Sequence, residues 1–274
     1  MRRLLMMRCR GPISVTVSSA AKKPLRPGTA APDAPVVVTA PEGPHPDGAA
    51  LPWMLHNPGA RAPVLVVCDH ATRRMPPDLR RLGLDDWVLD THVAWDIGVD
   101  ELVRCLADEL DAPAVLAGFS RLIIDPNRRP DDPDAIPALS DGIAIPGNQD
   151  LDEAARQQRI DSFFRPYHGA IEARLDGFRE RGIAPAVIAV HTCTPVFDRV
   201  VRPWHIGVMW DKDPRIPLPV MRHFDAIDSI CFGKPMPSSL KNSKTRDSMI
   251  RCGRPSWCCC PCIPWVSWEM NGPT

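Results

Sequence analysis

Two histidines stand where the chain could bind a metal ion. His70 follows an apolar run and Asp69, and His191 ends a second apolar run. Two neutral imidazoles that face one crevice are good Zn²⁺ ligands, and a carboxylate commonly completes a catalytic site that leaves one position for water. Taken singly, each could be a hydrogen-bonded histidine at the end of a strand. Their equivalent positions favour a shared divalent metal, zinc in particular.

The sequence leaves three roles possible for Asp96. It lies in "THVAWDIGVD", residues 91–100, directly before a helical pattern. The carboxylate could bind the metal, orient a ligand histidine or act as the N-cap of the helix. His92, in the same stretch, is interpreted as structural.

The segment "LIIDPNRRP", residues 122–130, places polar side chains at the exit of an apolar run. A solvated turn would account for it. The alternative is a substrate site, because an arginine offers a rigid, bidentate fork for a carboxylate. Asn127 and Arg128 are the candidates for that role, Asp125 would fix the arginine or the turn, and Arg121 could face a second anionic group. Arg129 is interpreted as a surface residue.

The pattern that must position these residues alternates short apolar runs with amphipathic segments. Strands are predicted within 62–70, 112–118, 122–125, 184–195 and 204–211, and helices within 96–110 and 148–182. In the second helix Asp150 is the expected N-cap and Pro166 is expected to kink or split it. The apolar stripes comprise Ile97, Leu102, Leu106 and Leu110 in the first helix, and Ile160, Phe163, Phe164, Tyr167, Ile171, Leu175 and Phe178 in the second. His168, beside that stripe, is interpreted as a surface or core-edge histidine.

This alternation predicts an α/β fold: a single three-layer domain of the phosphorylase/hydrolase-like type, with a mainly parallel or mixed central sheet. Sites in such sheets lie beyond the carboxyl ends of the strands. Three predicted strands end in polar residues there: Asp69 and His70, residues 125–129, and His191 with Thr192.

Composition narrows the function classes. The chain has 274 residues, and its 33 basic and 33 acidic residues give no net charge, so nothing indicates a nucleic-acid partner. No apolar run approaches the roughly 20 residues of a membrane span. Six of the ten cysteines follow residue 230 and the others are scattered, which suggests no disulfide framework. We therefore expect a reducing, cytoplasmic location and a small-molecule partner. The oligomeric state is not predicted.

Both ends of the chain depart from the α/β pattern. Residues 1–50 are predicted to be a disordered extension and linker. Their start resembles a transit peptide, or else the start codon was assigned too far upstream. The composition favours the second explanation. Residues 51–224 are predicted to form the domain. In 225–274 the pattern is lost, which is expected of a truncated or frame-shifted end. The run "CCCPC" there matches no ordinary zinc spacing, and a thiol-rich interaction module is the weakest functional hypothesis.

Five motifs carry a family resemblance. "HVAWDIGVDEL", "FSRLIIDPNRRPDDPDAI", "SDGIAIPGN", "FRPYHGAIEARL" and "VHTCTP" occur in the order typical of the N-formylglutamate amidohydrolase family, from about Val64 to about Asp213. The resemblance implies an α/β hydrolase similar to zinc carboxypeptidases and aspartoacylases. It also implies metal-assisted hydrolysis of an N-formyl or N-acyl amide on an acidic amino acid, and a place in amino-acid catabolism such as histidine degradation.

The resemblance also implies roles for single residues. "DPNRR" resembles the carboxypeptidase segment that holds the substrate carboxylate, so Asn127 and Arg128 would bind it. His70 and His191 would be zinc ligands. The carboxypeptidase pattern has a ligand Glu three residues after the first histidine, where this chain has Arg73; Asp96 is therefore the candidate carboxylate ligand, with Asp69 in reserve.

A late Glu that would serve as general base has no good counterpart here. Glu269 is the only Glu after residue 200, and it lies in the patternless tail. The catalytic base is thus unassigned, and we expect the hydrolase to be impaired. The alternative function is a non-catalytic remnant of the same fold that still binds an anion or a carboxylate.

Overall fold

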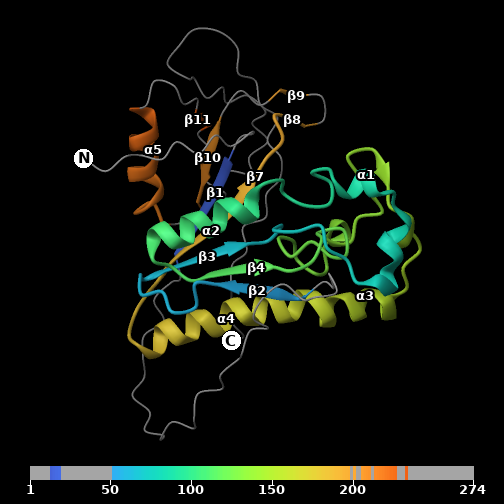
Figure 1. The fold of residues 1–274 in the computed structure, drawn as a ribbon, viewed down its shortest axis with the longest axis horizontal. Coiled ribbons are helices and arrows are strands. Elements are labelled where there is room, and N and C mark those ends of the chain that lie inside the picture. The colour runs from blue at the N-terminus through green and yellow to red at the C-terminus, as the bar shows by residue number, and fades with distance from the viewer. Residues whose placement is uncertain are drawn as a thin grey trace, which may run out of the picture.

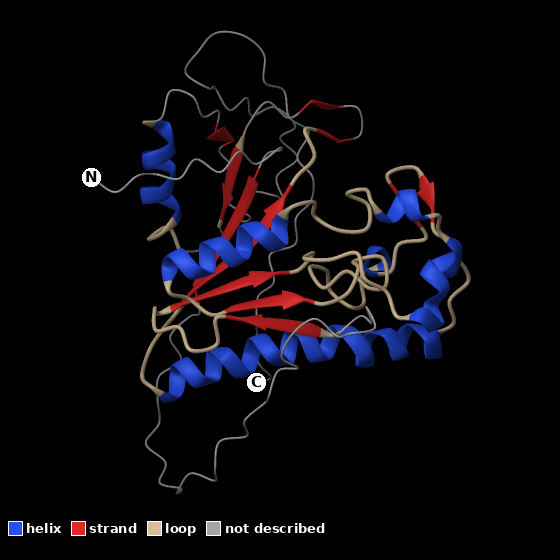
Figure 2. Ribbon diagram, viewed as in Figure 1, coloured by secondary structure: helices blue, strands red, loops and turns tan. Residues whose placement is uncertain are grey.

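The computed structural model describes residues 13–19, 51–197, 200–201, 205–210, 213–226 and 232–233. A seven-stranded mixed sheet, in the order β11-β10-β1-β7-β3-β4-β2, carries helices on both faces (Figures 1 and 2). The predicted α/β class with a mixed sheet is therefore confirmed. Its strands are β1 Ile13–Ser19, β2 Trp53–His56, β3 Val64–Cys68, β4 Ala114–Ala117, β7 Ala186–Thr192, β10 Ile206–Met209 and β11 Phe232–Gly233.

Strands β7, β3 and β4 form the parallel centre of the sheet. Val66 pairs with Ala114 of β4 and with Ile188 of β7, so the three carboxyl ends lie along one edge. Strand β2 runs antiparallel on the outside of β4. On the other side β1 pairs antiparallel with β7 and parallel with β10. The carboxyl edge of β3, β4 and β7 is where a fold of this kind places its site.

Both faces of the central strands are buried. Leu65 and Val67 of β3 belong to the apolar cluster on the α4 side, and Val66 and Cys68 belong to the cluster on the α2 side. This alternation explains why the strand is apolar at every position, as expected for a parallel strand covered on both faces. Helix α2 contacts β3, β4 and β7, whereas α4 contacts β2, β3 and β4.

Helix α2, Val99–Leu110, starts later than predicted. Its buried residues are Val99, Val103 and Ala107, one every fourth position. Of the predicted stripe, Leu102 and Leu106 pack at the edge of that buried face, which confirms half of it. Ile97 and Leu110 were wrong: Ile97 lies before the helix, and both are exposed. Ile97 was counted as a helix residue because the helix was predicted to begin at Asp96, whereas it begins at Val99.

The second predicted helix is a continuous helical run in three parts: α3 Glu153–Arg159, the π-helical η4 Ile160–Phe164 and α4 Arg165–Glu180. Its N-cap is Asp152, whose side chain accepts a hydrogen bond from the Ala155 N–H at 2.7 Å, so the predicted N-cap Asp150 was wrong. Pro166 lies in the first turn of α4, where the run divides, as predicted. Proline has no backbone N–H to donate. The turn before it is a π turn, in which the Arg165 N–H donates to the Ile160 carbonyl. The predicted apolar stripe does pack into the core.

Residues 122–125, predicted as a strand, form a buried turn and loop. The carbonyl of Leu122 accepts a hydrogen bond from the Asn148 side chain at 2.8 Å, and that of Ile123 accepts one from Arg159 at 3.0 Å. Buried backbone groups must be paired, and here side chains pair them in place of a neighbouring strand. The apolar run was correctly predicted to be buried, but its conformation was wrong.

Smaller elements fill the region beyond the carboxyl edge and the far end of the sheet. Residues such as Leu82, Val93 and Ile145 form a third apolar cluster there. Helix α5 packs against β10 and β11. The remaining elements are η1 Pro77–Gly83, α1 Asp86–Leu89, η2 Pro133–Ala135, β5 Leu139–Ser140, β6 Ile143–Ala144, η3 Pro146–Asn148, β8 Val196–Phe197, β9 Val200–Val201 and α5 Pro217–Asp225.

One strand lies within the range 1–50, which was predicted to contain no folded element. Strand β1 sits between β7 and β10, and it pairs over its whole length with β7. The rest of that range, and nearly all of the predicted tail with its cysteine run and Glu269, lie outside the described residues, so the predicted domain boundaries remain predictions.

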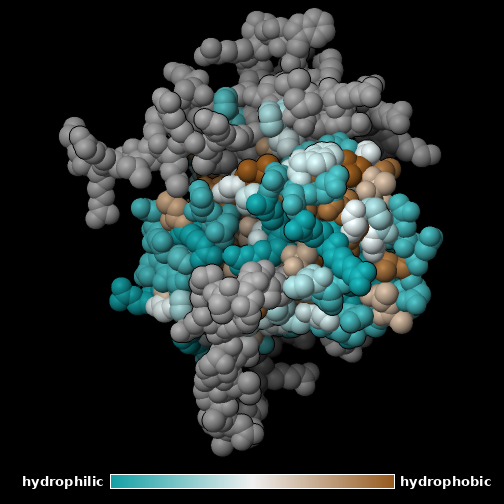
Figure 3. Space-filling view, turned by 45° about the vertical axis from the view of Figure 1, so that its right-hand side comes forward, coloured by the Kyte–Doolittle hydropathy of each residue, from teal (hydrophilic) through white to brown (hydrophobic). Residues whose placement is uncertain are grey.

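The visible surface of the described part is mainly polar. Figure 3 shows apolar residues as small separate patches on that face, whereas binding surfaces for large partners tend to be contiguous. Among the described residues, no helix combines the length and the apolar character that crossing a membrane requires.

Two glycines allow a test of how tightly the chain is packed directly after β4. A Cβ on Gly118, just after β4, would collide with the Leu51 carbonyl, whereas a Cβ on Gly177 in α4 would meet nothing within 4 Å. We expect Gly118→Ala to lower the free energy of unfolding by about 1–3 kcal/mol and Gly177→Ala to raise it by about 0.5–1 kcal/mol. Urea unfolding of the two variants measures both; equal effects would contradict the packing.

Candidate metal centre and the loop beside it

Three side chains converge at the carboxyl edge of the sheet, and we call them the His–Asp–His cluster: His70, Asp96 and His191. His70 follows β3, His191 lies near the end of β7, and Asp96 precedes α2. One potential ligand atom from each lies within 4.8 Å of the others, and all three residues are buried. The structure thus brings together the three residues predicted as metal ligands.

The local backbone fixes Asp96 and decides among its interpretations. Its N–H donates to the His70 carbonyl at 3.0 Å, and its own carbonyl accepts from the Val99 N–H at 3.1 Å. The N-cap of α2 is Gly98, whose φ of 78° is one that glycine adopts easily, and no side chain caps the helix. The N-cap interpretation of Asp96 was therefore wrong. Its side chain faces the two histidines instead.

Both imidazoles are held at both nitrogens. Nδ1 of His191 lies 2.9 Å from Asp96 Oδ2, and Nδ1 of His70 lies 3.4 Å from the same oxygen. On the other side of each ring, His70 Nε2 lies 2.8 Å from Asp125 Oδ1 and His191 Nε2 lies 3.3 Å from Asp69 Oδ2. The two rings meet edge to face, with centroids 4.9 Å apart. Each histidine therefore bridges the shared carboxylate and a carboxylate of its own.

The charges in this region do not balance when the imidazoles are neutral. Asp69, Asp96 and Asp125 are buried, and the guanidinium that lies among them is that of Arg121. Its Nη2 donates to Asp125 Oδ2 at 2.9 Å, and its Nη1 lies 3.6 Å from Asp96 Oδ1. Three carboxylates leave an excess of negative charge over Arg121, even with the guanidinium of Arg128 at 3.7 Å from Asp125. Buried charge of this kind needs a compensating cation or bound protons.

The pKa shifts follow from this arrangement. Burial alone would lower the pKa of His191, but the hydrogen bonds and charges of Asp69 and Asp96 outweigh it and raise that pKa to about 10. Burial and Arg121 lower the pKa of His70, and Asp125 and Asp96 outweigh them, so the shift is upward. Burial raises the pKa of the Asp96 carboxyl, but both imidazoles hold it well below its usual range. The cluster therefore attracts positive charge.

The donor set fits a divalent metal. A proton on each Nε2 can be held by Asp125 or Asp69, which leaves a lone pair on each Nδ1. Those two lone pairs and the Asp96 carboxylate then converge on one small volume. Carboxylates behind ligand histidines are the usual second layer of a zinc site, where they fix the tautomer of the imidazole. His70, Asp96 and His191 are thus the residues that could hold the ion.

Asp125 is the hub of the loop that follows β4. Its Oδ1 accepts from His70 Nε2 and from the Asn127 N–H at 2.9 Å, and its Oδ2 accepts from Arg121. Of the two roles suggested for it, fixing the turn is seen in its bond from the Asn127 N–H, whereas the arginine that it holds is Arg121 and not Arg128, which lies 3.7 Å away. Asp125 also bonds to His70 at 2.8 Å, a contact that the sequence did not indicate. Arg121 is occupied by Asp125 and faces Asp96, whereas the sequence suggested an anionic ligand for it.

Asn127 and Arg128 are half-buried beside this hub. Arg128 Nε lies 3.7 Å from Asp125 Oδ2, and its Nη1 lies 3.6 Å from Asp132 and 3.7 Å from Asp134. These separations exceed a hydrogen bond, so the carboxylates attract the guanidinium without using its donors. Arg129, by contrast, pairs with Asp131 in an exposed position.

Two residues of α4 support the site, a role that their sequence positions did not predict. The Tyr167 hydroxyl donates to Asp69 Oδ1 at 2.8 Å, and His168 Nε2 lies 2.9 Å from the Pro126 carbonyl. The available signal was a hydroxyl on an otherwise apolar stripe, because a buried hydroxyl needs a partner. His92, predicted to be structural, lies 3.0 Å from Asp141 and outside the cluster.

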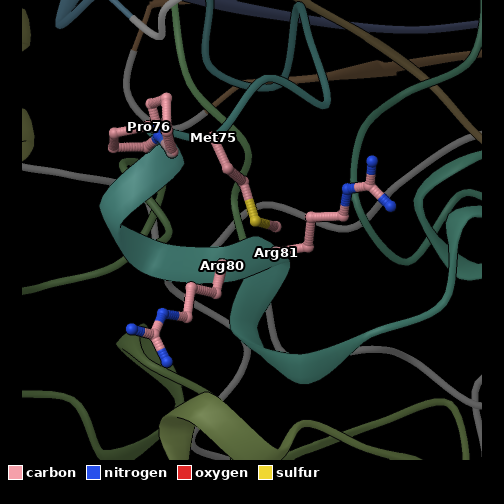
Figure 4. A pocket seen from close by; sticks show the side chains of 5 residues that line it. Met75, Pro76, Arg80 and Arg81 are labelled. Carbon is pink, nitrogen blue, oxygen red and sulfur yellow. The ribbon is translucent and has the colours of Figure 1, made fainter.

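A surface depression on η1 lies apart from this chemistry. Figure 4 shows Met75, Pro76, Arg80 and Arg81 around it, and Pro77 completes the lining. None of these residues belongs to the His–Asp–His cluster or to the loop of residues 121–129.

Removing Arg121 tests its charge-balancing role. In chelator-treated protein we expect Arg121→Met to lower the free energy of unfolding by about 3 kcal/mol, because two buried carboxylates lose their guanidinium. Arg104→Met is the matched control: Arg104 pairs with Asp100 on the surface of α2, and its loss should cost less than about 0.5 kcal/mol. Urea unfolding compares them, and equal losses would show that Arg121 is an ordinary surface cation.

Comparisons with known proteins identify a family for the chain. The chain matches the N-formylglutamate amidohydrolase family over residues 62–234. A gene product of Agrobacterium tumefaciens of known crystal structure is 34% identical, with a TM-score of 0.66 over 70% of this chain and 75% of that chain. An N-formylglutamate amidohydrolase of Ralstonia eutropha is 25% identical over 48% of this chain and 53% of that one, with a TM-score of 0.31.

No curated protein sequence matches the chain. The family match nevertheless covers more than half of its residues, including the His–Asp–His cluster and the loop beside it, and the resemblance drawn from the five motifs is confirmed. The chain belongs to the N-formylglutamate amidohydrolase family.

Proposed function

We propose that this chain is a metal-dependent amidohydrolase that cleaves the formyl or another small acyl amide of an acidic amino acid, with N-formylglutamate as the reference substrate. The observation that carries the proposal is the convergence of two Nδ1 atoms and one carboxylate oxygen in the buried His–Asp–His cluster. Protons can fill this space, but with each imidazole protonated on Nε2 the two Nδ1 atoms and the Asp96 carboxylate offer three electron pairs to one cation. Zn²⁺ is the ion that His and Asp ligands suit best.

The residues divide the reaction between holding the ion and holding the substrate. His70, Asp96 and His191 would bind the ion, which supplies Lewis acidity for the scissile carbonyl and makes water a stronger nucleophile at neutral pH. Asp125 and Asp69 keep the Nε2 protons of the two imidazoles away from the ligand atoms. Hydrolysis adds the oxygen of water to the acyl carbon and breaks its bond to nitrogen, which yields formate or another small acid and the free amino acid.

Arg128 and Asn127 would bind a substrate carboxylate. Arg128 lies 3.7 Å from Asp125, which itself contacts His70, so the guanidinium is one residue removed from the cluster. Its donors are not engaged in hydrogen bonds with described residues. A substrate carboxylate bound there would bring the amide toward the cluster. Arg121, predicted earlier as a second substrate contact, has the different task of balancing Asp125 and Asp96 in this proposal.

The base that accepts a proton from water is not assigned to any described side chain. The alternative function, a carboxylate-binding remnant without turnover, follows if no such group exists in the chain. The same purified protein distinguishes the two: N-formylglutamate raises the unfolding temperature in both cases, but formate is released only by the hydrolase. A cytoplasmic location and a role in histidine degradation remain predictions.

Zinc binding tests the metal assignment. Chelator-treated protein should take up about one Zn²⁺ per chain in calorimetry, and the double variant His70→Ala, His191→Ala should take up none at the same concentrations. His223→Ala, on the exposed side of α5, is the control for the loss of an imidazole and should bind like the unaltered chain. Full retention of zinc by the double variant would refute the assignment.

Adjacent arginines test the carboxylate site. We expect Arg128→Ala to lower kcat/KM for N-formylglutamate by about 10- to 100-fold, which is the value of a charge-assisted hydrogen bond. Arg128→Lys should recover little, because an ammonium cannot form the bidentate fork. Arg129→Ala is the matched control and should leave kcat/KM unchanged. Should the protein show no turnover, the same comparison is made on the dissociation constant, and equal effects at 128 and 129 would exclude the role.

A further inference from the structure

The chain contains a single tyrosine, and its hydroxyl meets a carboxylate beside the His–Asp–His cluster. Tyr167 is fully buried in the apolar cluster between α4 and the sheet. Its hydroxyl donates to Asp69 Oδ1 at 2.8 Å. A buried tyrosine in an apolar stripe could be replaced by phenylalanine without loss of packing, so the hydroxyl must be explained by the acceptor it meets.

That acceptor leads directly to a histidine of the cluster. The second oxygen of Asp69 lies 3.3 Å from His191 Nε2, and His191 Nδ1 lies 2.9 Å from Asp96. A carboxylate can rotate about its bond to the chain, and rotation of Asp69 would carry the Nε2 contact with it. With one oxygen fixed by Tyr167, the other is left in a defined place for the imidazole.

The other histidine has a support of the same layout but of different charge. Arg121 donates to Asp125 at 2.9 Å, and Asp125 accepts from His70 at 2.8 Å. Each arm thus consists of a donor, a carboxylate and an imidazole. The His70 arm ends in a cation that draws electron density from its carboxylate, whereas the His191 arm ends in a neutral hydroxyl. The carboxylate of the His191 arm therefore keeps more of its charge for the imidazole.

The π turn in the helical run explains how one helix supports both the loop that leads to Asp125 and the Asp69 carboxylate. Arg159 holds the Ile123 carbonyl in the loop that leads to Asp125, and Tyr167 holds Asp69. An α-helix advances about 100° per residue, so the eight positions between them would set the two side chains about 80° apart. The π turn of Ile160–Phe164 takes up one residue, and the offset becomes that of seven positions, about 20°. Both side chains then face the sheet edge.

We propose that Tyr167 is a positioning residue of the metal centre: its hydroxyl fixes the Asp69 carboxylate, and Asp69 in turn fixes the tautomer and the orientation of His191. The inference rests on the proposed function only in taking His191 as a metal ligand. Partners of this kind behind ligand histidines commonly change metal affinity by about 10- to 100-fold.

The test uses Co²⁺ as the probe, because its visible absorption reports both binding and the surroundings of the ion. We expect Tyr167→Phe, which acts through Asp69, to weaken Co²⁺ binding by up to about 10-fold and to change the absorption of the loaded protein. Phe178→Leu is the matched control: Phe178 lies in the same buried stripe of α4, three turns further on. It should lose thermal stability and keep the affinity and the spectrum.

A second variant shows whether Tyr167 acts through Asp69. Asp69→Asn alone should also weaken binding, and Tyr167→Phe added to it should cause no further loss, since residues in one chain of contacts are not additive. Independent losses in the double variant, or full affinity in Asp69→Asn, would overturn the inference. The second of these results decides the matter even where Tyr167→Phe does not fold.

The outcomes also separate this inference from the proposed function. An unaltered chain that binds neither Co²⁺ nor Zn²⁺ contradicts the metal-dependent hydrolase itself. An unaltered chain that binds Co²⁺, together with a Tyr167→Phe chain of the same affinity and the same spectrum, contradicts the positioning role alone.

Discussion

The oxygen Oδ2 of Asp96 lies between two buried imidazoles, and the rest of the site is arranged around that contact. Removing a carboxylate from water costs several kcal/mol, which only close partners offset. Asp96 meets this cost with His70 and His191 on one oxygen and Arg121 facing the other. Each imidazole then needs an acceptor for its far nitrogen, and this requirement places Asp125 and Asp69 where they are.

The scaffold positions the three residues of the His–Asp–His cluster from elements that the core already fixes. Strands β3 and β7 run in parallel and deliver His70 and His191 to one edge, and the N–H of Asp96 is tied to the carbonyl of His70. The helical run from α3 to α4 supports the site from the other face of the sheet, through Tyr167 on Asp69 and His168 on the Pro126 carbonyl. The site therefore shares its rigidity with the core, and little of it depends on exposed loops.

The sequence was sufficient to predict those elements whose structure is decided by burial alone. Val64–Cys68 and Ala186–Thr192 are apolar because both faces are covered, and the histidines at their ends could be predicted from position. Pairing between distant residues could not be predicted from the sequence. Tyr167 and Asp69 are 98 positions apart, and no local pattern links them. Asp96 remained open for the same reason, since a capping aspartate and a ligand aspartate look alike before a helix.

The wrong strand at residues 122–125 shows why such pairing matters to the chemistry. In an extended strand, four residues span about 13 Å, and Arg121 could not reach Asp125. The turn, held by Asn148 and Arg159 through the Leu122 and Ile123 carbonyls, brings these two side chains to 2.9 Å. Without that ion pair Asp125 would be a buried charge beside His70 with no cation closer than Arg128, at 3.7 Å. The irregular backbone is therefore a condition for the charge balance of the site, and residues remote from the cluster impose it.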